Sequence, residues 1–174
     1  MTLDRRVRPA RVDDVEAMVR LQIATWRNDY QAWLGTEFCD SSFENHVRAR
    51  LRGFIEAETP FRRTLVLECG GEQAGFVAYG AADRHPGEVF SMYVEPAWRR
   101  SGAGAYLFGQ AWADLCARGL TPVQIAVLER NVDARRFYLR IGASEFKREE
   151  FDLNGRTLRE VVFVLSSAAL DTQR

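Results

Sequence analysis

The sequence has little of what metal centres and nucleophilic hydrolases are built from. It contains two histidines, His46 and His85, and three cysteines that lie far apart in the chain. There is no Cys-x-x-Cys pair and no His-Glu-x-x-His motif, so neither a zinc site nor a disulfide framework is indicated. Two histidines also make a Ser-His or Cys-His nucleophile pair a poor prediction. We therefore expect no metal, and three reduced thiols in a cytoplasmic protein.

An excess of charge of one sign and long apolar runs are also missing. The 174 residues carry 24 basic and 24 acidic side chains, so the formal net charge is zero. A nucleic-acid-binding chain usually has a basic excess, and DNA or RNA is therefore not an expected partner. The longest strongly apolar run is short, about Val161 to Leu165, whereas a spanning helix needs roughly 20 apolar residues. We expect no signal peptide and no membrane contact.

Lysine is almost absent, because Lys147 is the only one. A Walker phosphate loop needs a Gly-Lys-Ser/Thr sequence, which excludes that motif. Arginine suits bidentate recognition of phosphate, but a codon bias across the genome explains the preference for arginine more simply.

The residues that are present suit one globular domain with a sizeable core. Hydrophobic spacing predicts helices over about residues 14–30, 41–57, 102–118 and 131–140. Alternating or buried apolar runs predict strands over about residues 5–9, 64–68, 73–79, 88–94, 122–128, 145–153 and 157–165. The strand–helix–strand order in the middle implies one parallel pair, and the hairpins imply antiparallel partners. We predict a mixed α/β fold with helices on both faces of the sheet.

Local signals predict where several elements begin and turn. Asp13 with Glu16, and Ser41 with Glu44, have the spacing of capping boxes at the starts of the first two helices. Asn131 is the expected cap of the fourth helix. Asn154-Gly155 predicts the turn of the last hairpin.

The most informative segment runs from Glu88 to Leu107, where a strand ends, a turn rich in arginine and glycine follows and a helix begins. The first N–H groups of a helix have no intrahelical acceptor and can bind a pyrophosphate. A dinucleotide-binding fingerprint needs glycine or alanine where Leu107 stands, so it does not fit. A plain glycine-rich surface turn remains the alternative for this loop.

Two motifs together resemble the GNAT N-acetyltransferase superfamily. The first is Arg99-x-x-Gly102-x-Gly104, preceded by Tyr93-Val94-x-Pro96. The second is the run from Asn131 through Ala134 and Phe137 to Tyr138, followed by Gly142-Ala143. The resemblance implies a single domain over residues 1–174 with its core from about 5 to 165. It also implies a central, mostly antiparallel sheet of about seven strands with a splayed parallel pair.

The resemblance implies acetyl-CoA as co-substrate. The backbone of the strand end would bind the pantetheine arm, the turn would hold the pyrophosphate, and the Asn131 amide would contact the cofactor. The implied cofactor-binding residues are Met92, Tyr93, Val94, Arg99, Arg100, Ser101, Gly102, Ala103, Gly104, Ala105, Asn131 and Tyr138.

The resemblance also implies an enzyme that moves an acetyl group directly to a primary amine through a tetrahedral intermediate. Tyr138 matches the tyrosine that protonates the leaving thiolate; packing in the core is its alternative role. Glu88 matches the general base of part of the family, and a solvated strand-end carboxylate is its alternative role. Other members carry a fifth-strand glutamate where this chain has Ala126, so the sequence departs from that subgroup.

The acceptor would be a small-molecule or peptide amine. Trp26, Tyr30 and Trp33, with Tyr79, are candidates to contact it through ring faces, although packing against the sheet explains them at least as well. A non-catalytic acyl-CoA-binding module and a nucleotide-phosphate module remain as other functions. The identity of the amine and a homodimer formed through a sheet edge are left open.

Overall fold

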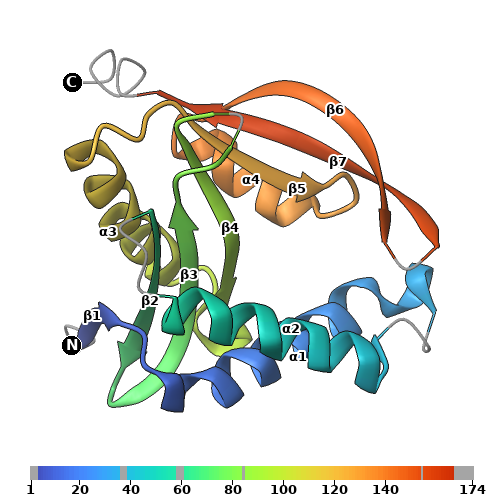
Figure 1. The fold of residues 1–174 in the computed structure, drawn as a ribbon, viewed down its shortest axis with the longest axis horizontal. Coiled ribbons are helices and arrows are strands. Elements are labelled where there is room, and N and C mark those ends of the chain that lie inside the picture. The colour runs from blue at the N-terminus through green and yellow to red at the C-terminus, as the bar shows by residue number, and fades with distance from the viewer. Residues whose placement is uncertain (1–3, 36–38, 58–60, 84, 154, 167–174) are drawn as a thin grey trace. The chain divides into compact units, whose positions relative to one another are not determined.

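The computed structural model describes residues 4–35, 39–57, 61–83, 85–153 and 155–166. In chain order the elements (Figure 1) are β1 (Arg5–Pro9), the 3-10 turn η1 (Val12–Asp14), α1 (Val15–Leu34), α2 (Ser41–Glu56), β2 (Arg62–Cys69), β3 (Glu72–Gly80), β4 (Gly87–Val94), the 3-10 turn η3 (Pro96–Trp98), α3 (Ala103–Ala117), β5 (Val123–Leu128), α4 (Val132–Arg140), β6 (Ser144–Leu153) and β7 (Arg156–Leu165). The strands form a seven-stranded sheet in the order β1-β2-β3-β4-β5-β7-β6. Within it β4 and β5 are parallel, which confirms the predicted mixed fold.

Contacts divide the chain into two compact units. The first contains Met1–Tyr79 and Ser91–Ala111, and the second contains Gly80–Phe90 and Trp112–Arg174. β4 and α3 each contribute residues to both units.

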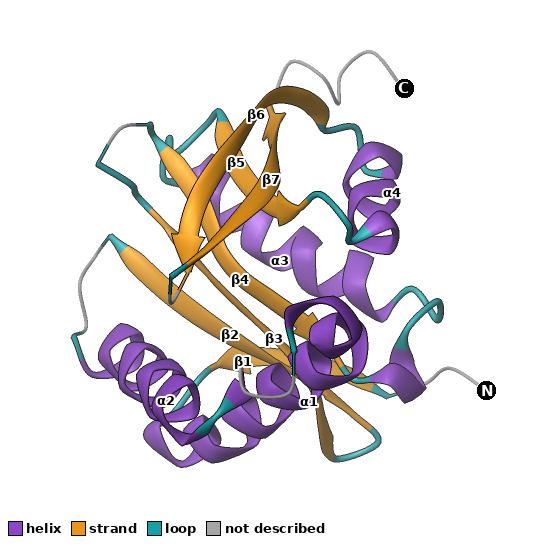
Figure 2. Cartoon of the chain, turned by 90° about the vertical axis from the view of Figure 1, so that its right-hand side faces the viewer, coloured by secondary structure: helices purple, strands orange, loops and turns teal. Residues whose placement is uncertain are grey.

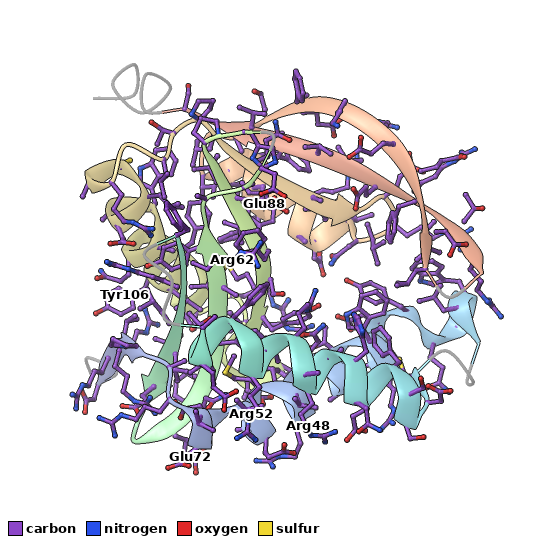
Figure 3. The ribbon with its side chains drawn as sticks, in the orientation of Figure 1. Arg48, Arg52, Arg62, Glu72, Glu88 and Tyr106 are labelled. Atoms are coloured by element: carbon purple, nitrogen blue, oxygen red, sulfur yellow. The ribbon has the colours of Figure 1, made fainter. Side chains whose placement is uncertain are left out.

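In the first unit, two helices cover the strands β1 to β3. α1 and α2 lie side by side (Figures 1 and 2). Each buries an apolar stripe at helical spacing, with Met18 and Val19 on α1 and Val47 and Leu51 on α2. On the outer side, Arg48 of α2 pairs with Glu16 of α1 at 2.8 Å. Figure 3 shows Arg48 and Arg52 on this outer side of α2.

The second unit is built on the antiparallel strands β5, β7 and β6. Ile125 of β5 lies opposite Phe163 of β7, and the β6–β7 ladder has an irregularity between Glu145 and Lys147. α4 contacts β6. The parallel pairing joins residues 87–89 of β4 to residues 123–125 of β5.

Two predicted capping residues are wrong, because a neighbouring aspartate occupies the cap position of each helix. α1 begins at Val15 after Asp14, not after Asp13, and the Asp14 side chain makes no cap to the helix. Its carboxylate accepts from the Arg11 backbone N–H at 2.7 Å and pairs with Arg8 instead. At α2, Asp40 accepts from the Phe43 backbone N–H at 2.9 Å, so Ser41 is already helical.

The first helix is longer than predicted. α1 continues to Leu34 because buried Tyr30 and Leu34 extend its apolar stripe, and it ends at Gly35, where φ is +90°. Asn131 caps α4 as predicted, accepting from the Ala134 backbone N–H at 3.0 Å. Asn154 of the predicted hairpin turn lies outside the described residues.

Candidate functional site

The turn between β4 and α3 is built as an anion cradle within the first unit. Gly102 has φ +84° and Arg100 has φ +60°, so the backbone reverses sharply before α3 begins at Ala103. As in any α-helix, the first-turn N–H groups of α3 have no intrahelical acceptor, and they lie at the positive end of the helix dipole. Arg100, which precedes them in the chain, is exposed. A diphosphate group fits this combination of amides and a guanidinium group.

Arg5 of β1 holds this turn from the N-terminal end of the chain. Its Nη2 donates to the carbonyl oxygen of Ser101 at 2.5 Å and lies 3.3 Å from the Ser101 hydroxyl. The hydroxyl in turn donates to the Trp98 carbonyl at 2.7 Å. Sequence reasoning missed Arg5 because it lies 96 residues from Ser101 and belongs to no motif.

Arg99 turns back from the cradle toward α1. Its Nε donates to the Val94 carbonyl at 3.1 Å, and its Nη1 lies 3.4 Å from the Asp29 carboxylate. The guanidinium therefore fixes the end of β4 against α1. The side chain of Arg100, which directly precedes the cradle, is exposed.

The end of β4 is held closely by β3 and by α1. A Cβ on Gly75 of β3 would meet the Tyr93 carbonyl oxygen at 2.6 Å, so only glycine allows this approach. The Trp26 indole N–H donates to the Tyr93 hydroxyl at 2.8 Å. Burial raises the pKa of the Tyr93 phenol, while the Trp26 hydrogen bond and the positive charge of Arg50 oppose that rise. This phenol is therefore a neutral hydrogen-bonding group.

Trp26, Tyr30 and Trp33, three of the four aromatic residues expected to contact the acceptor, form a cluster on α1. Trp26 lies edge-on to Tyr30, with ring centroids 5.1 Å apart, and also contacts Phe43 of α2 at 5.2 Å. Trp26 is half-buried. Tyr30 and Tyr79 are 6% and 1% exposed, which leaves a ligand little of either ring to touch.

In the second unit, Asn131 directly precedes α4, and α4 carries Tyr138. The Asn131 side-chain oxygen caps the helix, so this oxygen is already used as an acceptor. Tyr138 is 6% exposed and packs against Phe137 and Phe163, with ring centroids 5.1 and 6.0 Å away.

Glu88, labelled on β4 in Figure 3, belongs to a group of carboxylates in the second unit. Its Oε2 lies 3.4 Å from His85 Nε2. Burial raises the pKa of Glu160. Its cross-strand partner Glu149 raises this pKa further, and so does Glu88. A carboxyl group with a raised pKa is a better proton acceptor near neutral pH than an ordinary one.

Among the described residues, no group of three or more histidine, cysteine, aspartate or glutamate side chains could hold a metal ion. In the same part of the chain, no helix is both long enough and apolar enough to cross a membrane.

Comparison with known proteins places the chain in a family. Residues 16–143 match the model of the acetyltransferase (GNAT) family. The chain belongs to this family. It is therefore an acyltransferase, and the superfamily suggested by the two motifs is confirmed.

Solved structures share the fold of this acetyltransferase at low sequence identity. The PaiA N-acetyltransferase from Thermoplasma acidophilum, crystallised with coenzyme A, aligns with a TM-score of 0.74 at 17% identity, over 90% of this chain and 98% of that one. A GCN5-related N-acetyltransferase from Rhodopseudomonas palustris aligns with a TM-score of 0.75 at 19% identity, over 95% and 98%. An N-acetyltransferase from Staphylococcus aureus aligns with a TM-score of 0.73 at 15% identity, over 94% and 98%. A search of curated proteins found no match.

Two residues with long-range contacts or an altered pKa lie outside the two family motifs. Arg5 contacts Ser101 in the turn before α3, and Glu160 has a raised pKa. The one available signal for Glu160 was its strand position, because a carboxylate in a mostly apolar strand is expected to have an altered pKa.

Proposed function

We propose that this acetyltransferase transfers an acetyl group from acetyl-CoA to a primary amine, and that residues 1–174 form one acetyltransferase domain. The observation that carries the cofactor assignment is the turn before α3, with Gly102 at φ +84° and the exposed Arg100 directly before the unpaired helix amides. These groups suit the pyrophosphate of coenzyme A. The proposed pyrophosphate contacts are Arg99, Arg100, Ser101, Gly102, Ala103, Gly104 and Ala105.

The pantetheine arm is assigned to the backbone of Met92, Tyr93 and Val94. Three contacts fix this strand end. The backbone of Gly75 packs closely against the Tyr93 carbonyl, and Trp26 donates a hydrogen bond to the Tyr93 hydroxyl. Arg99 donates a hydrogen bond to the Val94 carbonyl. A rigid strand edge can bind an extended amide-containing chain as an added strand does. In this assignment, the Asn131 amide contacts the cofactor through its nitrogen, because its oxygen caps α4.

Bound acetyl-CoA supplies an activated thioester. The amine nitrogen forms the new C–N bond to the acetyl carbon, and the C–S bond breaks. We assign Tyr138 as the acid that gives its proton to the departing sulfur, and it regains a proton from solvent. A backbone N–H near Val94 stabilises the negative charge on the carbonyl oxygen.

The amine must lose a proton before or during attack, and Glu88 is the assigned base. Its support is the family position and the neighbouring His85, 3.4 Å away. Glu160, in the same unit, has a pKa raised by burial, by Glu149 and by Glu88. Charge repulsion from the neighbouring carboxylates therefore adds to the basicity of Glu160.

Release of free thiol over a panel of primary amines tests the proposal. The assignment requires release that depends on both acetyl-CoA and an amine, with acetylated product found by mass spectrometry. If the protein binds acetyl-CoA but produces no thiol with any protein, peptide or small amine, the non-catalytic module replaces the enzyme.

A further inference from the structure

Arg50 of α2 is a half-buried cation with no anionic partner. Its Nη2 lies 3.2 Å from the Ser91 hydroxyl of β4 and 3.5 Å from the Gln22 side-chain oxygen of α1. Its Nε is buried without a hydrogen-bond partner. Among the described residues no carboxylate lies within ion-pair distance of this guanidinium.

Two other partly buried arginines of the same unit, Arg8 and Arg48, are paired with carboxylates. Arg8 binds Asp14 at 2.7 Å and Glu68 at 2.6 Å. Arg48, two positions before Arg50, binds Glu16 at 2.8 Å and Glu44 at 2.9 Å. A charge that is partly removed from water is costly unless it is paired. Arg50 therefore differs from Arg8 and Arg48, and it shares with Arg5 a buried Nε without a hydrogen-bond partner.

Arg50 faces the strand to which the cofactor arm is assigned. Ser91 and Tyr93 project from the same face of β4 because side chains alternate along a strand. Contacts place this face toward the two helices, since Arg50 reaches Ser91 and Trp26 reaches Tyr93. The charge of Arg50 also acts on the Tyr93 phenol. The unpaired guanidinium thus lies on the helix-facing side of β4, beside the aromatic cluster.

We propose that Arg50 binds a carboxylate carried by the acetyl acceptor, so that the acceptor is a small amine of the amino-acid type. This inference rests on the proposed function. A guanidinium presents parallel N–H groups to a carboxylate, and the half-buried Arg50 side chain would do so through its terminal nitrogens. Trp26 supplies a half-buried ring for an apolar part of the same molecule.

Product-like probes test the carboxylate without depending on catalysis. Calorimetry compares N-acetylglycine and N-acetyl-L-phenylalanine with their carboxamides, which differ only in charge at one end. We expect the wild type to bind at least one carboxylate about tenfold or more tightly than its carboxamide. Arg50→Met should abolish this preference, and Arg52→Met, a change at an exposed arginine paired with Glu56 on the same helix, should keep it.

A second variant separates binding from structural support. Arg50→Gln keeps a donor for Ser91 but has no charge, so it should fold like the wild type and lose the carboxylate preference. The inference is overturned if the wild type binds neither carboxylate, binds carboxylate and carboxamide equally, or keeps its preference in Arg50→Gln. Thiol release measured in parallel shows which of the two proposals has failed. Activity toward neutral amines without any carboxylate preference overturns the Arg50 assignment alone. The absence of any amine-dependent thiol release overturns the proposed function.

Discussion

The indole nitrogen of Trp26 donates a hydrogen bond to the hydroxyl of Tyr93 across 2.8 Å. This contact joins α1 to the end of β4, and Phe76 of β3 packs against the same tyrosine ring with a centroid distance of 5.4 Å. A side chain expected to contact the acceptor therefore supports the strand whose backbone is assigned to the cofactor arm. Acceptor and cofactor binding would then be linked through one hydrogen bond.

The energy of this link can be measured in a double-mutant cycle. Trp26→Phe and Tyr93→Phe each remove one partner of the hydrogen bond, and the double variant removes both. We expect each single change to destabilise the protein and the coupling free energy to be about 1 kcal/mol, typical of a partly buried hydrogen bond. Urea unfolding of the four proteins gives this value. Strict additivity would show that the hydrogen bond contributes nothing.

The close approach of β3 to β4 predicts an unusual sensitivity at one glycine. Gly75→Ala would place a Cβ 2.6 Å from the Tyr93 carbonyl oxygen, a backbone atom that cannot move alone. We expect a loss of about 1–3 kcal/mol in unfolding free energy and weaker coenzyme A binding.

Gly109→Ala is the matched control. Gly109 lies within α3, and an added Cβ there meets nothing within 4 Å. Alanine is the better helix former, so this variant should be more stable by roughly 0.5–1 kcal/mol. Equal effects of the two changes in chemical denaturation would contradict the assigned close approach.

The cradle before α3 can be tested separately from backbone strain. Gly102→Ala and Gly155→Ala both place alanine at positive φ, +84° and +77°, and neither position is crowded by backbone. Both should lose about 1–2 kcal/mol of stability. Only Gly102→Ala should also weaken coenzyme A binding in calorimetry. Equal affinities for the two variants would remove the turn from the cofactor site.

Catalytic acid chemistry predicts a specific kinetic result for Tyr138→Phe. The change keeps the ring that packs against Phe163 and removes the proton donor. Turnover should fall about a hundredfold or more, while the affinity for acetyl-CoA stays near the wild-type value. Steady-state kinetics and calorimetry on the same preparation separate the two quantities. Unchanged turnover would exclude Tyr138 as the acid.

The altered carboxyl pKa values predict opposite pH dependences of stability. The pKa of Glu160 is raised by burial and by Glu149, so the folded state binds this proton more readily than the unfolded state. Stability is therefore lost as pH rises from the ordinary glutamate value through the raised one. Glu160→Gln should become more stable relative to the wild type as pH rises through this window.

Asp14 supplies the contrasting control. The Arg8 hydrogen bond lowers the pKa of its carboxyl group. Its stabilisation is present above the ordinary aspartate value and is lost as pH falls through the lowered pKa. Asp14→Asn should therefore be destabilised at neutral pH, with a difference that fades in acid. Thermal unfolding from pH 3 to 8 measures both trends; parallel curves for the two variants would contradict the assigned environments.

Periodic patterns and glycine-containing turns were enough to predict the element order. The predicted cap of α1 was wrong because Asp13 and Asp14 are both possible capping residues within one turn. The ion pair of Asp14 with Arg8, a tertiary contact, decides between them. The contacts of Arg5 and Arg50 and the raised pKa of Glu160 were also missed. Each depends on a residue on another segment, namely Ser101, Ser91 and Glu149, and local sequence carries no signal for such pairs.

The most direct test of the account is a calorimetric titration of coenzyme A into the wild-type protein and into Gly102→Ala. We predict saturable heat at one equivalent for the wild type and a clearly weaker affinity for the variant, with adenosine alone binding poorly to both. A folded wild-type protein that gives no saturable heat with coenzyme A would contradict the assignment of the turn before α3 as the cofactor cradle.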